Sequence, residues 1–133
     1  MPDFKYPVYK PNLSGNESRY VNECLDSSWI SSRGTFVTRF EREFAAWVGS
    51  TAATSCSNGT VSLHLALLAL GIGAGDEVIV PAFTYVASVN AIRYVGAIPV
   101  FVDSSLEDWQ MDLQAVERAL SPKTKAIMAV HLY

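Results

Sequence analysis

The chain has 133 residues, 50% of them hydrophobic, and a formal net charge of -3. That length fits one compact domain of ordinary size. The mild negative charge, with ten Lys and Arg scattered along the chain, gives no electrostatic reason to expect nucleic acid or a membrane as a partner. No apolar run approaches the ~20 residues of a membrane span, and the N-terminus lacks a signal-peptide pattern, so we expect a cytoplasmic protein.

Two cysteines, Cys24 and Cys56, are present, with no CxxC spacing and no clustered histidines. We therefore expect no metal site. The sequence leaves a disulfide between them open, but the composition favours two reduced thiols.

The first part of the chain predicts an arm, two helices and a loop between them. Residues 1–13 hold three of the six prolines and predict an extended arm. Ser14 is expected to open a helix, with Glu17 three residues later completing a capping box. Residues 27–34 break the helical period and predict a loop, and a second helix follows over residues 36–48, ended by a glycine.

After residue 50, short apolar runs alternate with helical periods. Strands are expected over residues 51–55, 77–80, 98–102 and 125–132, and helices over residues 60–70, 85–95 and 112–120. This alternation predicts an α/β fold with a mostly parallel sheet and flanking helices. Because the sequence stops at the end of a strand with no helix to cover it, we expect a fold that is incomplete at the C-terminus.

A candidate phosphate-binding turn joins the expected strand over residues 51–55 to the following helix. It covers residues 55–60 (SCSNGT), with Gly59 allowing close approach to the backbone and Thr60 starting the helix. Free N–H groups and the positive end of a helix dipole make such a turn suitable for a phosphate, and the Thr60 hydroxyl adds a donor. The alternative is that Asn58 only caps the helix and Gly59 only turns the chain.

A second candidate lies just past the next strand, where open α/β sheets place their ligands. Phe83 and Tyr85 stand there, and one of these rings would lie against a planar cofactor. The alternative is ordinary packing of both rings in the core. Together, the turn and the ring suit an aromatic ligand that carries a phosphate.

Other motifs are not in the context that their chemistry needs. The glycines over residues 71–75 follow a helix and precede a strand, the reverse of a dinucleotide loop. His64 is expected to pack on its helix, and His131 is either near a site or structural. No pair of carboxylates is placed for acid–base work, and Asp103, the best candidate, is expected to be structural.

An ordered set of motifs resembles a known family. The motifs are residues 29–34 (WISSRG), 57–60 (SNGT) with 63–67 (LHLAL), 75–81 (GDEVIVP), 85–88 (YVAS), and 124–128 (TKAIM) with 130–133 (VHLY). In this order and spacing they resemble the DegT/DnrJ/StrS sugar aminotransferases. The resemblance implies the large-domain fold of type I pyridoxal-phosphate-dependent aminotransferases. It also implies a homodimer and the transfer of an amino group from glutamate to a keto-sugar nucleotide for polysaccharide biosynthesis, and the likeness is greatest to members that act on a GDP-linked 4-keto-6-deoxymannose.

The resemblance also assigns residues by position. Asn58, Gly59 and Thr60 would hold the phosphate of pyridoxal 5'-phosphate, and Tyr85 would stack on its ring. The loop with Trp29, Ser31 and Ser32 would lie near the sugar nucleotide. In domain terms, residues 1–35 form the arm, helix and loop, and residues 36–133 form the first part of the cofactor-binding large domain.

The family's Schiff-base lysine and the aspartate that pairs with the pyridine nitrogen are both expected beyond Tyr133. The four lysines of this sequence match neither position. Residues 1–133 alone are therefore expected not to transaminate. Two alternatives stay open: a non-catalytic protein that binds the cofactor phosphate or a partner subunit, and a nucleotide-binding Rossmann-like module.

Overall fold

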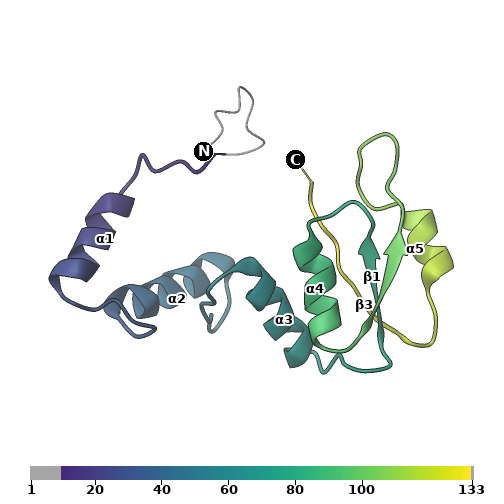
Figure 1. Ribbon diagram of the computed structural model, residues 1–133, viewed down its shortest axis with the longest axis horizontal. Coiled ribbons are helices and arrows are strands. Elements are labelled where there is room, and N and C mark those ends of the chain that lie inside the picture. The colour runs from purple at the N-terminus through teal and green to yellow at the C-terminus, as the bar shows by residue number, and fades with distance from the viewer. Residues whose placement is uncertain (1–9, 133) are drawn as a thin grey trace. The chain divides into compact units, whose positions relative to one another are not determined.

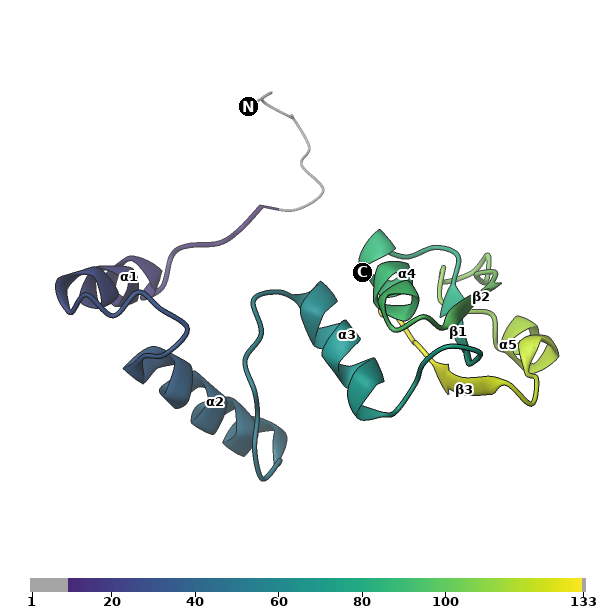
Figure 2. The same cartoon turned by 60° about the horizontal axis from the view of Figure 1, so that its bottom comes forward.

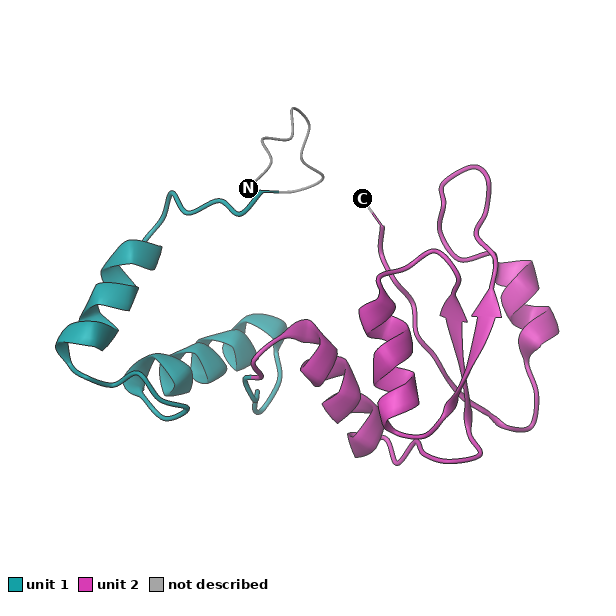
Figure 3. Cartoon of the chain, in the orientation of Figure 1, with its two compact units in different colours: residues 1–55 teal, residues 56–133 magenta. Residues whose placement is uncertain are grey.

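The computed structural model describes residues 10–132 and divides into two compact units, Met1–Ser55 and Cys56–Tyr133 (Figure 3). The domain boundary expected between residues 35 and 36 falls inside the first unit. As a division of the whole protein it stays a prediction. Residues 1–9 of the expected arm lie outside the described residues.

The first helix, α1 (Glu17–Asp26), begins three residues later than predicted. The expected capping box is wrong, because the Glu17 carboxylate accepts from the N–H of Gly15 at 2.9 Å. The N–H of Ser14 itself donates to Asn12 Oδ1 at 3.2 Å. Gly15 has a low helix propensity, which favours a turn before the helix over an earlier start.

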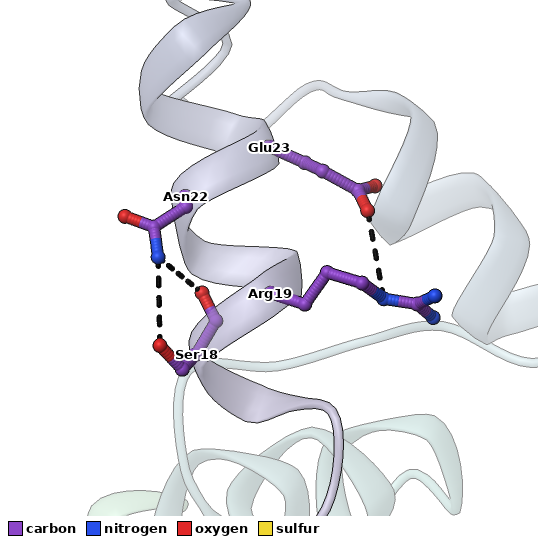
Figure 4. A network of polar contacts seen from close by, with 4 residues as sticks. All are labelled: Ser18, Arg19, Asn22 and Glu23. Atoms are coloured by element: carbon purple, nitrogen blue, oxygen red, sulfur yellow. Dashed lines mark hydrogen bonds and ion pairs between the residues drawn. The ribbon is translucent and has the colours of Figure 1, made fainter.

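Local polar contacts hold the exposed side of α1 (Figure 4). Asn22 Nδ2 donates to the carbonyl oxygen of Ser18 at 2.8 Å, and Arg19 Nε lies 3.6 Å from Glu23 Oε1. An exposed pair one helical turn apart contributes only about 0.3–0.5 kcal/mol. These contacts lie within α1, and the helix buries none of its residues. They therefore stabilise the helix itself only weakly.

The second helix, α2 (Thr35–Val48), confirms the prediction within one residue at its start. Gly49 ends it in the left-handed conformation with φ 69°, where a residue without a Cβ is favoured. The preceding loop is also confirmed. The rings of Tyr20 on α1 and Phe36 on α2 lie 5.0 Å apart.

The strand predicted over residues 51–55 is wrong, because this segment is irregular. The N–H and hydroxyl of Ser55 both donate to Glu41 Oε1, each at 2.8 Å. These two hydrogen bonds lower the pKa of the Glu41 carboxyl. The Glu41 carboxylate of α2 therefore accepts the hydrogen bond from the Ser55 N–H that a neighbouring strand would otherwise have accepted.

The second unit is an α/β layer structure, as predicted (Figure 1). Its elements in chain order are α3 (Gly59–Ala69), β1 (Glu77–Pro81), α4 (Val86–Tyr94), β2 (Ile98–Val102), α5 (Leu113–Ala119) and β3 (Thr124–Ile127). The three strands form a parallel sheet in the order β2-β1-β3. The last strand was expected to reach residue 132 and ends five residues earlier.

The core lies on both faces of β1, and the four residues of this central strand that are buried, Val78 to Pro81, are all apolar. Val78 and Val80 pack with Leu67 of α3 and Ile92 of α4 on one face. Ile79 points the other way and packs with the α5 side of the sheet. Figures 1 and 2 show α4 and α5 on opposite faces of the sheet.

Candidate functional site

The topology of the second unit defines an edge at which ligands bind in open α/β sheets. The chain moves from β1 to β2 through α4, then returns past β1 to β3 through α5 on the opposite face. Such a reversal opens a crevice outside the carboxyl ends of the strands. Helices α3 and α4 both begin on this side of the sheet (Figures 1 and 2).

The first turn of α3 presents backbone donors at this edge. Asn58 is extended, with φ -167° and ψ 169°, and its Oδ1 accepts from the N–H of Val61 at 3.0 Å. Asn58 therefore caps the helix, and its expected contact with a phosphate stays a prediction. The cap does not occupy the N–H groups of Gly59 and Thr60, which have no acceptor within the helix. The first turn also carries no acidic residue, so the positive end of the helix dipole is not neutralised there.

Gly59 stands in open space. A Cβ built on it meets no heavy atom within 4 Å among the described residues, and its φ is not left-handed. Neither its backbone conformation nor these neighbours require a glycine. The alternative that Gly59 serves only to turn the chain is therefore weakened, and close approach of a ligand remains as a reason for the missing side chain.

Tyr85 is the residue before α4, and its side chain is 72% exposed. The alternative that its ring packs in the core is therefore wrong. The side-chain hydrogen bond at the start of the helix joins the Thr84 and Ser88 hydroxyls, which lie 3.0 Å apart, and does not involve Tyr85. The ring face is thereby left available for a planar partner.

Phe83 in the same loop packs against Trp109, with ring centroids 5.7 Å apart and planes at 55°. Trp109 follows β2 and adopts a φ of 62°, which is rare for a side chain of its size. The sequence pattern did not predict Trp109 beside this loop. The signal that could have found it is an aromatic residue in the segment after a strand's carboxyl end.

The residues expected near a sugar nucleotide lie in the first unit. The Ser31 hydroxyl accepts from the N–H of Arg33 at 3.2 Å and donates to its carbonyl oxygen at 3.1 Å, which fixes the loop locally. Trp29 is 61% exposed and Ser32 is exposed. Trp29 lines a groove of about 670 Å³, together with Arg33, Gly34, Thr35, Thr38, Arg39 and Arg42.

Several other expectations concern groups outside these sites. Both cysteines are free thiols. Within residues 10–132 no cluster of His, Cys, Asp or Glu is arranged to hold a metal ion. In the same range no helix is long and apolar enough to cross a membrane. His64 packs its ring edge-on against Tyr94, with centroids 5.6 Å apart, as a helical histidine was expected to do.

The sequence matches the DegT/DnrJ/EryC1/StrS aminotransferase family over residues 11–133, nearly the whole chain. The chain belongs to this family. The residue patterns that indicated it extend from the loop over residues 29–34, through the two candidate sites, to the segment over residues 124–133.

Individual relatives agree with this assignment. The chain is 62% identical over 127 residues to GDP-perosamine synthase of Escherichia coli O157:H7, covering 96% of this chain and 35% of the relative. An aminotransferase from Psychrobacter cryohalolentis superposes with a TM-score of 0.83 at 39% identity, over 92% of this chain and 31% of that one. A putative sugar aminotransferase from Streptococcus pneumoniae in its PLP form gives 0.82 at 36% identity, over 93% of this chain and 31% of that one.

The chain thus spans about a third of the length of the relatives it matches. Over that third, the parallel α/β arrangement expected for a type I aminotransferase large domain is confirmed.

Proposed function

We propose that the protein is a pyridoxal-phosphate-dependent aminotransferase that transfers an amino group from glutamate to a keto-sugar nucleotide. The observation that carries the proposal is the 62% identity to a GDP-perosamine synthase over almost the entire chain. On that basis the substrate is GDP-linked 4-keto-6-deoxymannose and the product is a GDP-perosamine. The physiological setting is the synthesis of a polysaccharide such as a lipopolysaccharide O-antigen, in the cytoplasm and as a homodimer.

The residues at the edge of the second unit fit the cofactor that the family assignment indicates. A phosphate dianion suits the first turn of α3, which carries no acidic residue and in which the N–H groups of Gly59 and Thr60 have no acceptor within the helix. The Thr60 hydroxyl has no hydrogen-bond partner among the residues that the structure describes, so it is available as a third donor. Space above Gly59 permits close approach of the phosphate.

Tyr85 is proposed to contact the ring of the cofactor. Its exposed ring stands at the beginning of α4, a helix that packs against α3. Stacking on a flat heteroaromatic ring is worth about 0.5–1.5 kcal/mol beyond the area it buries. When bound, pyridoxal phosphate supplies an electron sink for the amino-group transfer.

The parts played by this chain are binding and orientation. Asn58 fixes the turn through its hydrogen bond to Val61, Gly59 and Thr60 donate to the phosphate, and Tyr85 limits the tilt of the ring. The resemblance places the lysine that would anchor the cofactor and move the proton outside residues 1–133. These residues by themselves are therefore proposed to bind without transaminating.

The test is amino transfer by the whole gene product with pyridoxal phosphate, using ¹⁵N-glutamate and a keto-sugar nucleotide. We expect ¹⁵N in the sugar product by mass spectrometry, with the GDP-linked substrate preferred over the UDP- and dTDP-linked ones. A transfer that prefers another nucleotide would overturn the substrate assignment and keep the reaction. Absence of transfer to all three would overturn the proposed function.

The alternative is a protein that binds the cofactor phosphate or a partner subunit without catalysis. It predicts reversible cofactor binding in the whole gene product, with no covalent adduct after borohydride reduction. A reduced, covalently attached cofactor would exclude it.

A further inference from the structure

The loop between β2 and α5 is a turn closed by backbone hydrogen bonds. The N–H of Ser105 donates to the Gln110 carbonyl oxygen at 2.9 Å, and the N–H of Trp109 donates to the Ser105 carbonyl oxygen at 3.1 Å. An antiparallel bridge between Ser104 and Met111 flanks these bonds. Because β1 and β2 are parallel, this loop leaves the sheet at the same edge as the loop from β1 to α4 (Figure 1).

Trp109 occupies a position in this turn that suits a residue without a bulky side chain. Its φ of 62° is left-handed, and only one other residue besides glycine, Ser28, has a positive φ between residues 10 and 132. Loops between antiparallel segments commonly place glycine at such a position. A large side chain there is strained, and such strain persists only where the surrounding contacts fix it. The backbone of the turn therefore gives no reason for a tryptophan, and the contact that its side chain makes becomes informative.

That contact is with Phe83, in the loop that leads from β1 to α4. The two ring centroids lie 5.7 Å apart with the planes at 55°, a favourable geometry for an aromatic pair. The pair joins loops that follow two neighbouring strands. Since Phe83 precedes Tyr85 by two residues, Trp109 restrains the middle of the loop that carries the proposed ring platform.

The two ends of the same loop are held by hydrogen bonds. The N–H of Ala82 donates to the carbonyl oxygen of Val102, the last residue of β2, at 2.8 Å. The Thr84 and Ser88 hydroxyls, 3.0 Å apart, fix the start of α4. Neither bond involves the side chain of Tyr85, which is 72% exposed. The direction of this ring therefore depends on how the middle of the loop is held.

The turn with Trp109 is itself anchored on its other side. Gln110 Nε2 donates to the carbonyl oxygen of Leu132, in the segment after β3, at 3.0 Å. The Gln110 N–H donates to Asp108 Oδ1, also at 3.0 Å. Trp109 thus packs on Phe83 from a base that is tied to the segment after another strand.

We propose that Trp109 is a positioning residue, which acts through Phe83 to hold the loop before α4 so that the Tyr85 ring faces the cofactor. The inference rests on the proposed function for the presence of pyridoxal phosphate at Tyr85. It deepens that function by giving a role to a residue that belongs neither to the phosphate-binding turn nor to the ring platform.

The experiment replaces Trp109 with asparagine in the whole gene product. Asparagine tolerates the left-handed backbone, so the turn is kept while the ring on Phe83 is lost. In the apoprotein, backbone amides over residues 83–88 should exchange with deuterium several-fold faster than in the wild type. The affinity for pyridoxal phosphate should fall about two- to tenfold, the range that corresponds to losing the ring stacking.

A third measurement is the visible circular dichroism of the bound cofactor. Pyridoxal phosphate is achiral, so this signal depends on how firmly the protein orients it. Per bound cofactor, the signal should be weaker in Trp109→Asn and recovered in Trp109→Phe, which keeps an aromatic ring against Phe83. If Trp109→Asn does not fold by thermal melting, Trp109→Gly replaces it, because glycine also accepts the left-handed backbone.

The matched control is Leu106→Ala in the same turn, where the leucine side chain is 93% exposed. It should keep the wild-type exchange, affinity and dichroism. A Tyr85→Ala variant tests whether Trp109 acts through Tyr85. In that background, Trp109→Asn should cause no further loss of affinity.

Unchanged exchange over residues 83–88 in Trp109→Asn would overturn the inference, and so would losses of affinity that add to those of Tyr85→Ala. A Leu106→Ala variant with the same losses would show that the turn, and not the ring, is responsible, which also overturns it. If the wild type binds no pyridoxal phosphate, the proposed function and the cofactor role of Trp109 both fail. The exchange measurement in the apoprotein then still decides whether Trp109 holds the loop.

Discussion

Replacing Gly59 with alanine distinguishes two roles of this position: a role in folding of the start of α3, and a role in close approach of the cofactor phosphate. The added methyl group meets no heavy atom within 4 Å of the described chain, and the backbone there is not left-handed. Alanine in a helix is favoured over glycine by up to about 1 kcal/mol, with a smaller gain in the first turn. For folding alone, Gly59→Ala should therefore be neutral or slightly stabilising.

For cofactor binding the expectation has the opposite sign. A phosphate oxygen about 2.7–3.2 Å from the Gly59 N–H would lie close to the new methyl group. Moving the phosphate away loses a charge-assisted hydrogen bond worth about 1.5–3 kcal/mol. Since 1.4 kcal/mol is tenfold, we expect the cofactor affinity to fall about 10- to 100-fold.

The assay has two parts: thermal unfolding of the apoprotein and a fluorescence titration with pyridoxal phosphate. Gly73→Ala is the matched control, because its Cβ would make only an ordinary contact of 3.8 Å to the Val95 carbonyl oxygen. The control should keep the wild-type affinity. If Gly59→Ala also keeps it, the phosphate does not lie against this turn and the reasoning is refuted.

Three further predictions concern the ring platform, the Glu41 contact and the core. Tyr85→Ala should weaken cofactor binding while leaving the apoprotein melting temperature unchanged, because the side chain is 72% exposed; a lower melting temperature would mean that the ring packs internally. Glu41→Gln should lower the melting temperature at neutral pH by weakening both contacts to Ser55. Because the folded-state pKa of Glu41 lies below its ordinary 4.5, this stabilisation is present above that value and fades as the pH falls through the folded pKa, so a gap that persists in acid would contradict the role of its charge. Ile79 of β1 is fully buried, so Ile79→Ala should lower the free energy of unfolding in urea by about 2–5 kcal/mol. Ile127 is half-exposed, so Ile127→Ala should lower it clearly less. Equal losses would show that Ile79 is no more deeply buried than Ile127.

The sequence predicted the elements whose signals are local and strong. The β-branched run over residues 77–80 and the aromatic stripe of α2 followed by Gly49 predicted the strand and the helix to within one residue at each end. The strand expected over residues 51–55 (TAATS) is wrong. Its Ser55 N–H is taken by Glu41, 14 residues earlier, and no periodicity in the sequence reports such a contact.

The same difference between local signals and contacts distant in the sequence holds at the candidate sites. A cap followed by glycine predicted the turn at Asn58, because a helix start is determined by neighbouring residues. The packing of Phe83 on Trp109 was missed, since it joins loops after two different strands. The arginines around Trp29 were seen only as scattered charges, because their convergence depends on the loop bringing Arg33 to the side of α2.

The most direct test of the central claim is a crystal structure of the whole gene product with pyridoxal phosphate bound. We expect phosphate oxygens within about 2.7–3.2 Å of the Gly59 and Thr60 backbone nitrogens, with the Tyr85 ring stacked on the cofactor ring. A phosphate bound elsewhere, with the first turn of α3 facing only solvent, would contradict the account.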